Sequence, residues 1–166
     1  YAGITRTNYL LENKDKIDFE GKDKIIAQAN FLRAFYYFQL VKYFGDVPLI
    51  IDERLGTSEV TEIERAPKAE VYAQIETDLT NAAAALDWTS DQKGRITKGA
   101  CLALLGKVYL YQDKFDEAAA TLETVITEGP YDLIDDYNDL FSVVNEGHSE
   151  TVFDVQFTGA QGGSYE

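Results

Sequence analysis

The sequence predicts a mainly α-helical fold built from antiparallel helical hairpins, with a short strand near the C-terminus. Residues 22–44, 67–86 and 97–130 carry this prediction, because each repeats apolar residues every three or four positions, the period of one helix face. One hairpin cannot bury its own apolar face, so such hairpins must stack. The 166 residues are therefore expected to form part of one domain with two hairpins, 22–86 and 97–130, the first interrupted by a long insertion at 45–66.

The second hairpin has the spacing of a tetratricopeptide unit. Its first-helix positions are Leu102, Leu105, Gly106 and Tyr109, with leucine in place of the usual tryptophan, and its second-helix positions are Ala118, Leu122 and Pro130. Gly106 lets the partner helix approach closely, and Ala118 fills the tight contact from the other side. Asp113 is expected to cap the second helix, and the Gly-Pro pair at 129–130 is expected to end it.

The first 20 residues predict a helix that runs to about Lys14, with a modest apolar face of Ile4, Tyr9 and Leu11. Gly21 breaks the pattern.

Residues 22–44 predict a long helix that is apolar around most of its circumference. One expected face follows three-four spacing, and a second face holds phenylalanines; the members are Ile25, Ala29, Leu32, Tyr36, Leu40 and Tyr43, and then Phe31, Phe35 and Phe38. Such a helix lies between two neighbours. Arg33 is the exception, and it needs a carboxylate partner or a route to the helix edge.

Seven aromatic residues lie between Phe31 and Phe44. They could stack on sugar rings, but their helical spacing favours a place in the core. Tyr36, Tyr37 and Tyr43 keep polar tips that could reach the surface.

Residues 67–86 complete the first hairpin. Pro67 is suited to the first helical position, and the expected apolar face is Tyr72, Ile75, Leu79, Ala82 and Leu86. Between the hairpins, a surface loop at 87–95 contains Trp88, which is expected to cover the hairpin ends rather than to bind a ligand. Leu49 to Ile51 suggest a short extended segment in the insertion.

After Pro130 the pattern changes. Four aspartates gather at Asp132, Asp135, Asp136 and Asp139, but the glycine and terminal glutamate of a calcium-binding loop are absent, so no metal site is predicted. In residues 151–157, Phe153, Val155 and Phe157 alternate with Asp154 and Gln156, which predicts a half-buried strand.

Composition argues against several functions. The net charge of −14 disfavours binding to nucleic acid or to an anionic membrane surface. The charge is uneven, since residues 1–48 carry seven Lys/Arg and six Asp/Glu, whereas residues 49–166 carry eight and twenty-three. The lone Cys101, inside a helix, is expected to be a small buried residue rather than a nucleophile. With His148 as the single histidine and no glycine-rich phosphate loop, no catalytic residue or cofactor site is predicted.

The chain begins Tyr-Ala-Gly and ends Gly-Ser-Tyr-Glu, which suggests a fragment of a longer protein whose targeting signals lie elsewhere.

Several motifs together resemble the SusD/RagB family. The stretch ANFLRAFYYFQLVKYFGDVPLI is similar to the family's most recognisable segment, and RAPKAEVYAQIETDLTNAAAAL resembles its second helix. The 94–126 hairpin, YDLIDDYNDLF and the Glu150–Phe157 stretch then follow in the family's order. The likeness covers essentially the whole chain.

The resemblance implies a non-catalytic surface lipoprotein of the outer membrane. Such a protein captures glycans, or in some branches peptides, for import through a SusC-like TonB-dependent transporter, and it is anchored by an N-terminal lipid that this segment lacks. In the family, ligand contacts come largely from regions outside these helices. No ligand-binding residue is therefore assigned here.

Two other functions were weighed. An intracellular tetratricopeptide adaptor would grip a peptide in its helical groove, but the repeats are irregular and the groove positions expected of a carboxylate clamp are not evident. An enzyme is the third possibility, yet 29 acidic residues make chance carboxylate pairs certain, so their spacing cannot predict a glycosidase.

Overall fold

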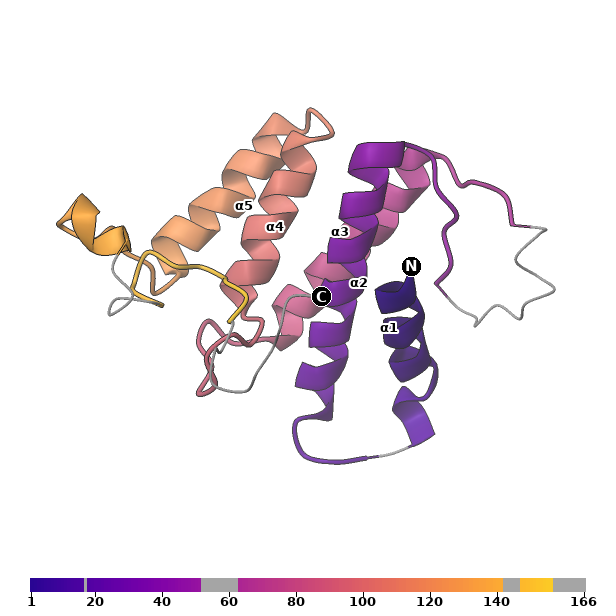
Figure 1. Ribbon diagram of the computed structural model, residues 1–166, viewed down its shortest axis with the longest axis horizontal. Helices are drawn as coiled ribbons and strands as arrows, with labels where there is room; N and C mark the ends of the chain where they lie inside the picture. The colour runs from indigo at the N-terminus through magenta and orange to yellow at the C-terminus, as the bar shows by residue number, and fades with distance from the viewer. Residues whose placement is uncertain (17, 52–62, 142–146, 157–166) are drawn as a thin grey trace.

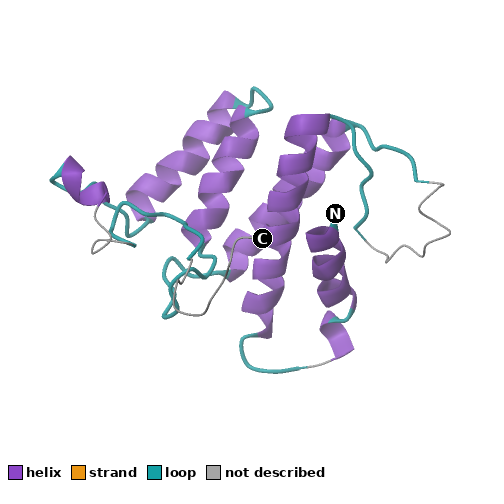
Figure 2. Cartoon of the chain, viewed as in Figure 1, coloured by secondary structure: helices purple, strands orange, loops and turns teal. Residues whose placement is uncertain are grey.

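The computed structural model describes residues 1–16, 18–51, 63–141 and 147–156. Its elements are α1 (Ala2–Glu12), η1 (Lys14–Lys16), α2 (Lys22–Phe44), α3 (Lys68–Ala85), α4 (Lys98–Leu110), α5 (Phe115–Glu128) and η3 (Tyr137–Phe141). Over these described ranges the chain is helical with no strand, as the colouring of Figure 2 shows. The mainly α fold of antiparallel helical hairpins is confirmed.

The helices stack in chain order, each packed against the next (Figure 1). Short turns reverse the chain between α1 and α2 and between α4 and α5, so that neighbours run antiparallel. This arrangement buries the apolar faces that isolated hairpins would expose to water. Among the described helices, none combines the length and apolar character needed to cross a membrane.

The core lies between α2, α3 and α4. The predicted face of α3 is confirmed, because all five of its apolar residues are buried: Tyr72, Ile75, Leu79, Ala82 and Leu86. Pro67 precedes the helix as its N-cap residue, one position earlier than expected. Fully burying a side chain such as Ile75 or Leu79 stabilises the fold by about 1.5–3 kcal/mol. The buried face of α3 therefore contributes strongly to its packing against α2 and α4.

The buried face of α2 differs from the predicted one. The residues that enter the core are Ala27, Phe31, Ala34, Tyr37, Phe38 and Val41, whereas Tyr36 is partly exposed and Tyr43 and Phe44 are mostly exposed. Of the predicted three-four face only Ala29 is fully buried, whereas Phe31 and Phe38 of the second predicted face are buried as expected. The three-four face was wrong because a helix with apolar residues on every side offers several equivalent stripes. Packing partners, not periodicity, select among them. The core role predicted for the seven aromatic residues holds for Phe31, Tyr37 and Phe38 only.

Helix α1 ends at Glu12, close to the expected boundary, but its buried residues are Ile4, Thr7 and Asn8. Tyr9, expected on the apolar face, is 51% exposed. The small Gly3 allows α1 to lie directly against the Tyr36 ring of α2, because a Cβ at that position would collide with the ring. Of the predicted apolar face only Ile4 is fully buried, and the polar residues Thr7 and Asn8 complete the buried side of α1.

The crossing of α4 and α5 follows the tetratricopeptide register. A Cβ added to Gly106 would lie 2.6 Å from both Cγ and Cδ2 of Leu122, so only glycine allows this approach. Ala118 and Leu105 are buried beside it. The turn is tied to α3, because Glu76 Oε1 accepts hydrogen bonds from Gln112 Nε2 at 2.7 Å and from Lys114 Nζ at 2.5 Å.

The observed helix caps agree only in part with those predicted from the sequence. Thr97 caps α4, with its side chain accepting from the Ala100 N–H, and α5 ends at Glu128 before Gly129. Asp113 does not cap α5, because Lys114 is the N-cap residue and no side chain accepts there. Asp113 instead takes a left-handed conformation with φ of 59°, which reverses the chain.

The strand predicted at 151–157 is not formed over its described residues, 151–156. An alternating segment becomes a strand only beside a partner strand, and the Phe153 ring packs instead against Phe31 of α2, with ring centroids 5.5 Å apart. In the insertion, a single antiparallel bridge joins Val47 and Ala66, and Leu49 to Ile51 form no strand. Residues 52–62 of that insertion lie outside the described residues, and the domain boundaries stay a prediction.

We expect Gly106→Leu to destabilise the intact protein by about 1–3 kcal/mol, the usual cost of overpacking. The branched side chain would occupy the space of Leu122. Thermal melting measures the effect, and Lys107→Leu is the control because it adds the same side chain at the adjacent exposed position. Equal melting temperatures for the two variants would contradict the close α4–α5 contact.

Candidate functional site

A buried ion pair joins the two longest helices. Arg33 of α2 donates through Nε to Asp78 Oδ2 and through Nη2 to Asp78 Oδ1, both at 2.7 Å. The two residues are only 8% and 2% exposed. The carboxylate partner that Arg33 requires is therefore Asp78, and the paired geometry is the strong bidentate form of this interaction.

Further polar groups complete the hydrogen bonding of this pair. Arg33 Nη1 donates to Asn8 Oδ1 and to the Ile51 carbonyl, both at 3.1 Å, and Gln74 donates to Asp78 Oδ1 at 2.9 Å. Within the described part of the chain, every buried side-chain nitrogen and oxygen has a hydrogen-bond partner. A buried charge is tolerated only under such conditions.

The same cluster fixes the start of the long insertion. Ile50 uses both backbone groups, since its N–H donates to Tyr37 Oη at 2.6 Å and its carbonyl accepts from Tyr37 Oη at 2.8 Å and from Asn8 Nδ2 at 2.7 Å. Burial raises the pKa of Tyr37 to about 12. Tyr1 adds a hydrogen bond to the Pro48 carbonyl at 3.0 Å.

A polar hollow of about 310 Å³ opens beside the ion pair. Amides, a hydroxyl and charged groups from α1, α2 and α3 dominate its lining, which includes Asn30, Gln74, Thr77, Asp78, Asn81 and Glu12. It therefore offers both hydrogen-bond donors and acceptors.

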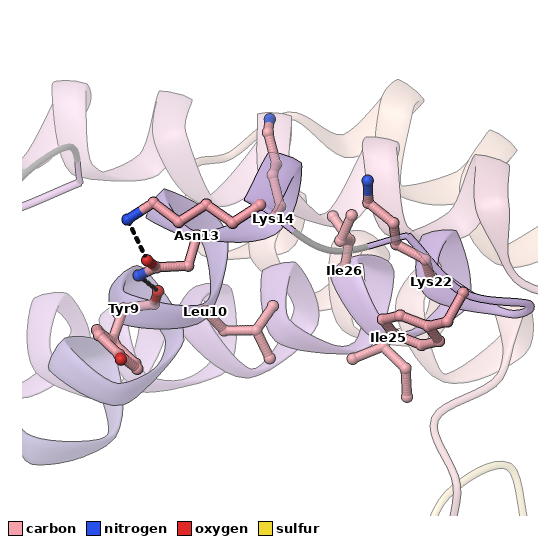
Figure 3. Close-up of a pocket in the computed structure, with 9 residues that line it drawn as sticks. Tyr9, Leu10, Asn13, Lys14, Lys22, Ile25 and Ile26 are labelled. Carbon is pink, nitrogen blue, oxygen red and sulfur yellow. Dashed lines mark hydrogen bonds between the residues drawn. The ribbon is translucent and has the colours of Figure 1, made fainter.

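A second hollow, which we call the apolar hollow, lies between α1 and the start of α2 (Figure 3). Its volume is about 440 Å³, within the range of about 300–1,000 Å³ typical of ligand pockets. Apolar side chains come from both helices and from the turn between them, namely Tyr9, Leu10, Phe19, Ile25 and Ile26. An apolar cavity with a few polar groups at its rim is the usual form of a binding site.

The rim of the apolar hollow carries positive charge. Lys14, Lys16 and Lys22 line it together with Asn13, and no carboxylate does. In Figure 3 the side chains of Lys14 and Lys22 rise on the same side of the hollow. Asn13 joins the rim to α1, because its amide donates to the Tyr9 carbonyl at 2.7 Å and its oxygen accepts from Lys16 Nζ at 2.6 Å.

Two more hollows flank the loop after α3, with volumes of about 540 and 250 Å³. Trp88 lies nearby, partly buried, with its ring 6.5 Å from that of Tyr131 and 5.0 Å from Lys98 Nζ. Tyr131 in turn packs on Gly99 of α4. The expected place of Trp88 over the end of the hairpins agrees with these contacts.

The remaining reactive residues form no recognisable catalytic arrangement among the described residues. Cys101 is fully buried, and burial raises the pKa of its thiol to about 12, which suppresses the reactive thiolate. The imidazole of His148 accepts through Nδ1 from the Glu150 N–H at 3.2 Å. Over the described ranges, no group of three or more His, Cys, Asp or Glu side chains is placed to hold a metal ion.

Several aromatic side chains near helix ends are half exposed or more. They are Tyr43 and Phe44 at the end of α2, Tyr111 and Phe115 at the α4–α5 turn, and Tyr137 and Phe141 of η3. Surfaces of this kind usually contact another part of the protein or a partner.

Sequence reasoning identified Arg33 but missed the groups around it. Asp78 and Asn8 occupy ordinary helical positions with no local signal of burial, and Tyr37 was placed among residues with a surface tip. The one available signal was the long insertion itself, whose first residues need polar partners for their backbone groups.

Comparison with known proteins gives consistent matches. A SusD-like family model, described as "Starch-binding associating with outer membrane", matches residues 1–110. SusD-like protein P2 from Formosa agariphila is 35% identical over 165 residues, which cover 96% of this chain and 33% of that protein.

Solved structures agree with the sequence matches. A laminarin-binding SusD-like protein superimposes with a TM-score of 0.86 at 40% identity, over 92% of this chain and 35% of that one. A SusD-like protein from Bacteroides fragilis gives a TM-score of 0.85 at 31% identity, over 95% of this chain and 32% of that one. The chain thus spans about a third of the length of these relatives.

We expect Asp78→Asn to lower the free energy of unfolding of the intact protein by about 3–5 kcal/mol, because it leaves the Arg33 charge buried without a counter-ion. Urea denaturation measures the loss. Asp87→Asn is the matched control, since it breaks the Lys24 ion pair, whose side chains are 57% and 66% exposed, and exposed pairs contribute little.

Replacing both partners separates the two possible causes of that loss. If the unpaired charge is responsible, Arg33→Met/Asp78→Leu is expected to be more stable than Asp78→Asn. A double variant less stable than the single one would show that the polar network itself is required.

Proposed function

The chain belongs to the SusD-like family, and from this membership we propose that the intact protein is a glycan-binding protein of the outer-membrane surface. It would capture glycans, or in the alternative peptides, and deliver them for import through a SusC-like TonB-dependent transporter. Anchoring would come from an N-terminal lipid outside this segment. The observation that carries the proposal is the family match over residues 1–110, joined by relatives that cover nearly the whole chain.

The ligand class is supported by the relatives. One solved relative binds laminarin, at 40% identity over 92% of this chain, and the family description names starch. Both are neutral glucans, so a glucan is the first ligand to test. Family membership also favours glycan capture over an intracellular peptide-binding adaptor.

The described part of the molecule would act as the rigid base of the binding protein. The Arg33–Asp78 pair, Asn8 and Tyr37 hold three helices and the start of the insertion in one unit. Such a base can hold loops at a defined distance from one another, which reduces the ordering cost of binding a flexible chain.

The exposed aromatic residues at the helix ends support a role in assembly. Tyr43, Phe44 and Tyr111 are at least half exposed, and aromatic side chains are enriched in protein interfaces. In the proposed function they would contact the remainder of the protein or the transporter.

We expect the intact protein to bind a soluble glucan with a dissociation constant between about 1 μM and 1 mM, which corresponds to about −8 to −4 kcal/mol. Isothermal titration calorimetry with laminarin and soluble starch measures the affinity. Affinity electrophoresis in gels with and without polysaccharide gives an independent reading.

Incubation products distinguish binding from catalysis. The proposal expects retardation in the gel with no release of smaller sugars during overnight incubation. Release of reducing ends would contradict the non-catalytic part of the proposal, and binding to no glycan of a broad panel would contradict the proposal as a whole.

A further inference from the structure

The apolar hollow has an unusual balance of hydrogen-bonding groups. Its charged lining consists of three lysines, and each ammonium group is a donor with no acceptor capacity. The oxygen of Asn13 is already used by Lys16. The groups left to contact a ligand are an apolar floor and a rim whose polar groups are almost all hydrogen-bond donors.

A rim of this kind selects among sugars. A neutral sugar hydroxyl both donates and accepts, so it is best satisfied where both kinds of partner are present. A carboxylate or sulfate group only accepts, and its hydrogen bonds to ammonium groups are of the stronger charge-assisted type. The lining therefore fits an anionic group better than a hydroxyl.

The floor fits a sugar ring. Tyr9 and Phe19 are about half exposed, at 51% and 47%, and both line the hollow. Their rings offer flat apolar surface, which complements the apolar C–H face of a pyranose. A pyranose held by either ring would lie in the hollow that Lys14 and Lys22 also line, and these two side chains rise on the same side of it (Figure 3).

The charge distribution of the chain agrees with this site. Most of the excess acid lies beyond residue 48, whereas residues 1–48 carry seven Lys/Arg against six Asp/Glu. Asp15, Asp18, Glu20 and Asp23 belong to the same stretch as the lysines, and none of them lines the hollow. The charged groups that line this hollow are therefore all ammonium groups, on a chain with net charge −14.

We infer that the apolar hollow binds the charged unit of an acidic glycan, one that bears carboxylate or sulfate groups. The inference rests on the proposed glycan-binding function and extends it to a second ligand class and a defined site. The ring lies on Tyr9 and Phe19, and the anionic group pairs with Lys14, Lys16 and Lys22.

The test is calorimetry of the intact protein with three ligands: oligosaccharides of a uronic acid, a sulfated galactan and laminarin. We expect at least one anionic ligand to bind, and its affinity to fall as the salt concentration rises from about 0.02 to 0.3 M, because screening weakens exposed ion pairs. The uronic-acid and galactan arms show whether carboxylate or sulfate is preferred.

The double variant Lys14→Gln/Lys22→Gln tests whether the anionic ligand binds in the apolar hollow. It is expected to weaken binding of the anionic ligand at least tenfold and to leave laminarin binding unchanged. Lys68→Gln/Lys107→Gln is the matched control, since it removes the same charge from exposed positions on α3 and α4 and is expected to keep full affinity. Equal melting temperatures confirm that all variants are folded.

The outcomes separate this inference from the proposed function. Binding of laminarin alone, or unchanged affinity in Lys14→Gln/Lys22→Gln, overturns the inference and leaves the glycan-binding function standing. An equal loss in the control variant also overturns it, because net charge rather than the hollow would then be responsible. Binding of none of the three ligands overturns the inference, and failure across the broader panel overturns the function as well.

Discussion

The rest of the structure depends on the charge that α2 carries into the interior. An unpaired guanidinium in that position would cost several kcal/mol, so the fold must bring a carboxylate and further acceptors to Arg33. Asp78 of α3 supplies the carboxylate, Asn8 of α1 supplies its amide oxygen, and Ile51 at the start of the insertion supplies its carbonyl. Apolar burial draws these helices together without fixing their register. The directional hydrogen bonds supply the register, since a shift of one residue would leave the charge without its partners.

The sequence predicted what depends on local spacing. The apolar face of α3 follows from positions three, four and seven apart, and the close helix approach at Gly106 follows from the tetratricopeptide spacing; both are present. The face of α2 could not be predicted, because its apolar residues surround the helix and only the neighbours decide which enter the core. The prediction of a strand at 151–157 was wrong for a related reason. The side chains do alternate, but the Phe153 ring packs against Phe31 of α2 and not beside a neighbouring strand.

The candidate site was less predictable than the fold, because it joins groups that are distant in sequence. Asp78 lies 45 residues from Arg33, and at that separation no spacing rule applies. The apolar hollow combines Leu10 of α1 with Ile25 of α2, which belong to different predicted elements. The resemblance to the SusD/RagB family supplied the functional hypothesis, whereas residue chemistry alone supplied only exclusions such as the buried Cys101 thiol.

The two hollows beside α1 differ in a way that bears on ligand choice. The polar hollow offers amides and carboxylates from Asn30, Asn81 and Glu12, and so contains donors and acceptors together. Lys14 lines both hollows, yet only in the apolar one are all the charged neighbours ammonium groups. A neutral sugar rich in hydroxyls would gain more hydrogen bonds in the polar hollow. An acceptor-only anion would meet repulsion from Glu12 in the polar hollow, whereas no carboxylate lines the apolar hollow.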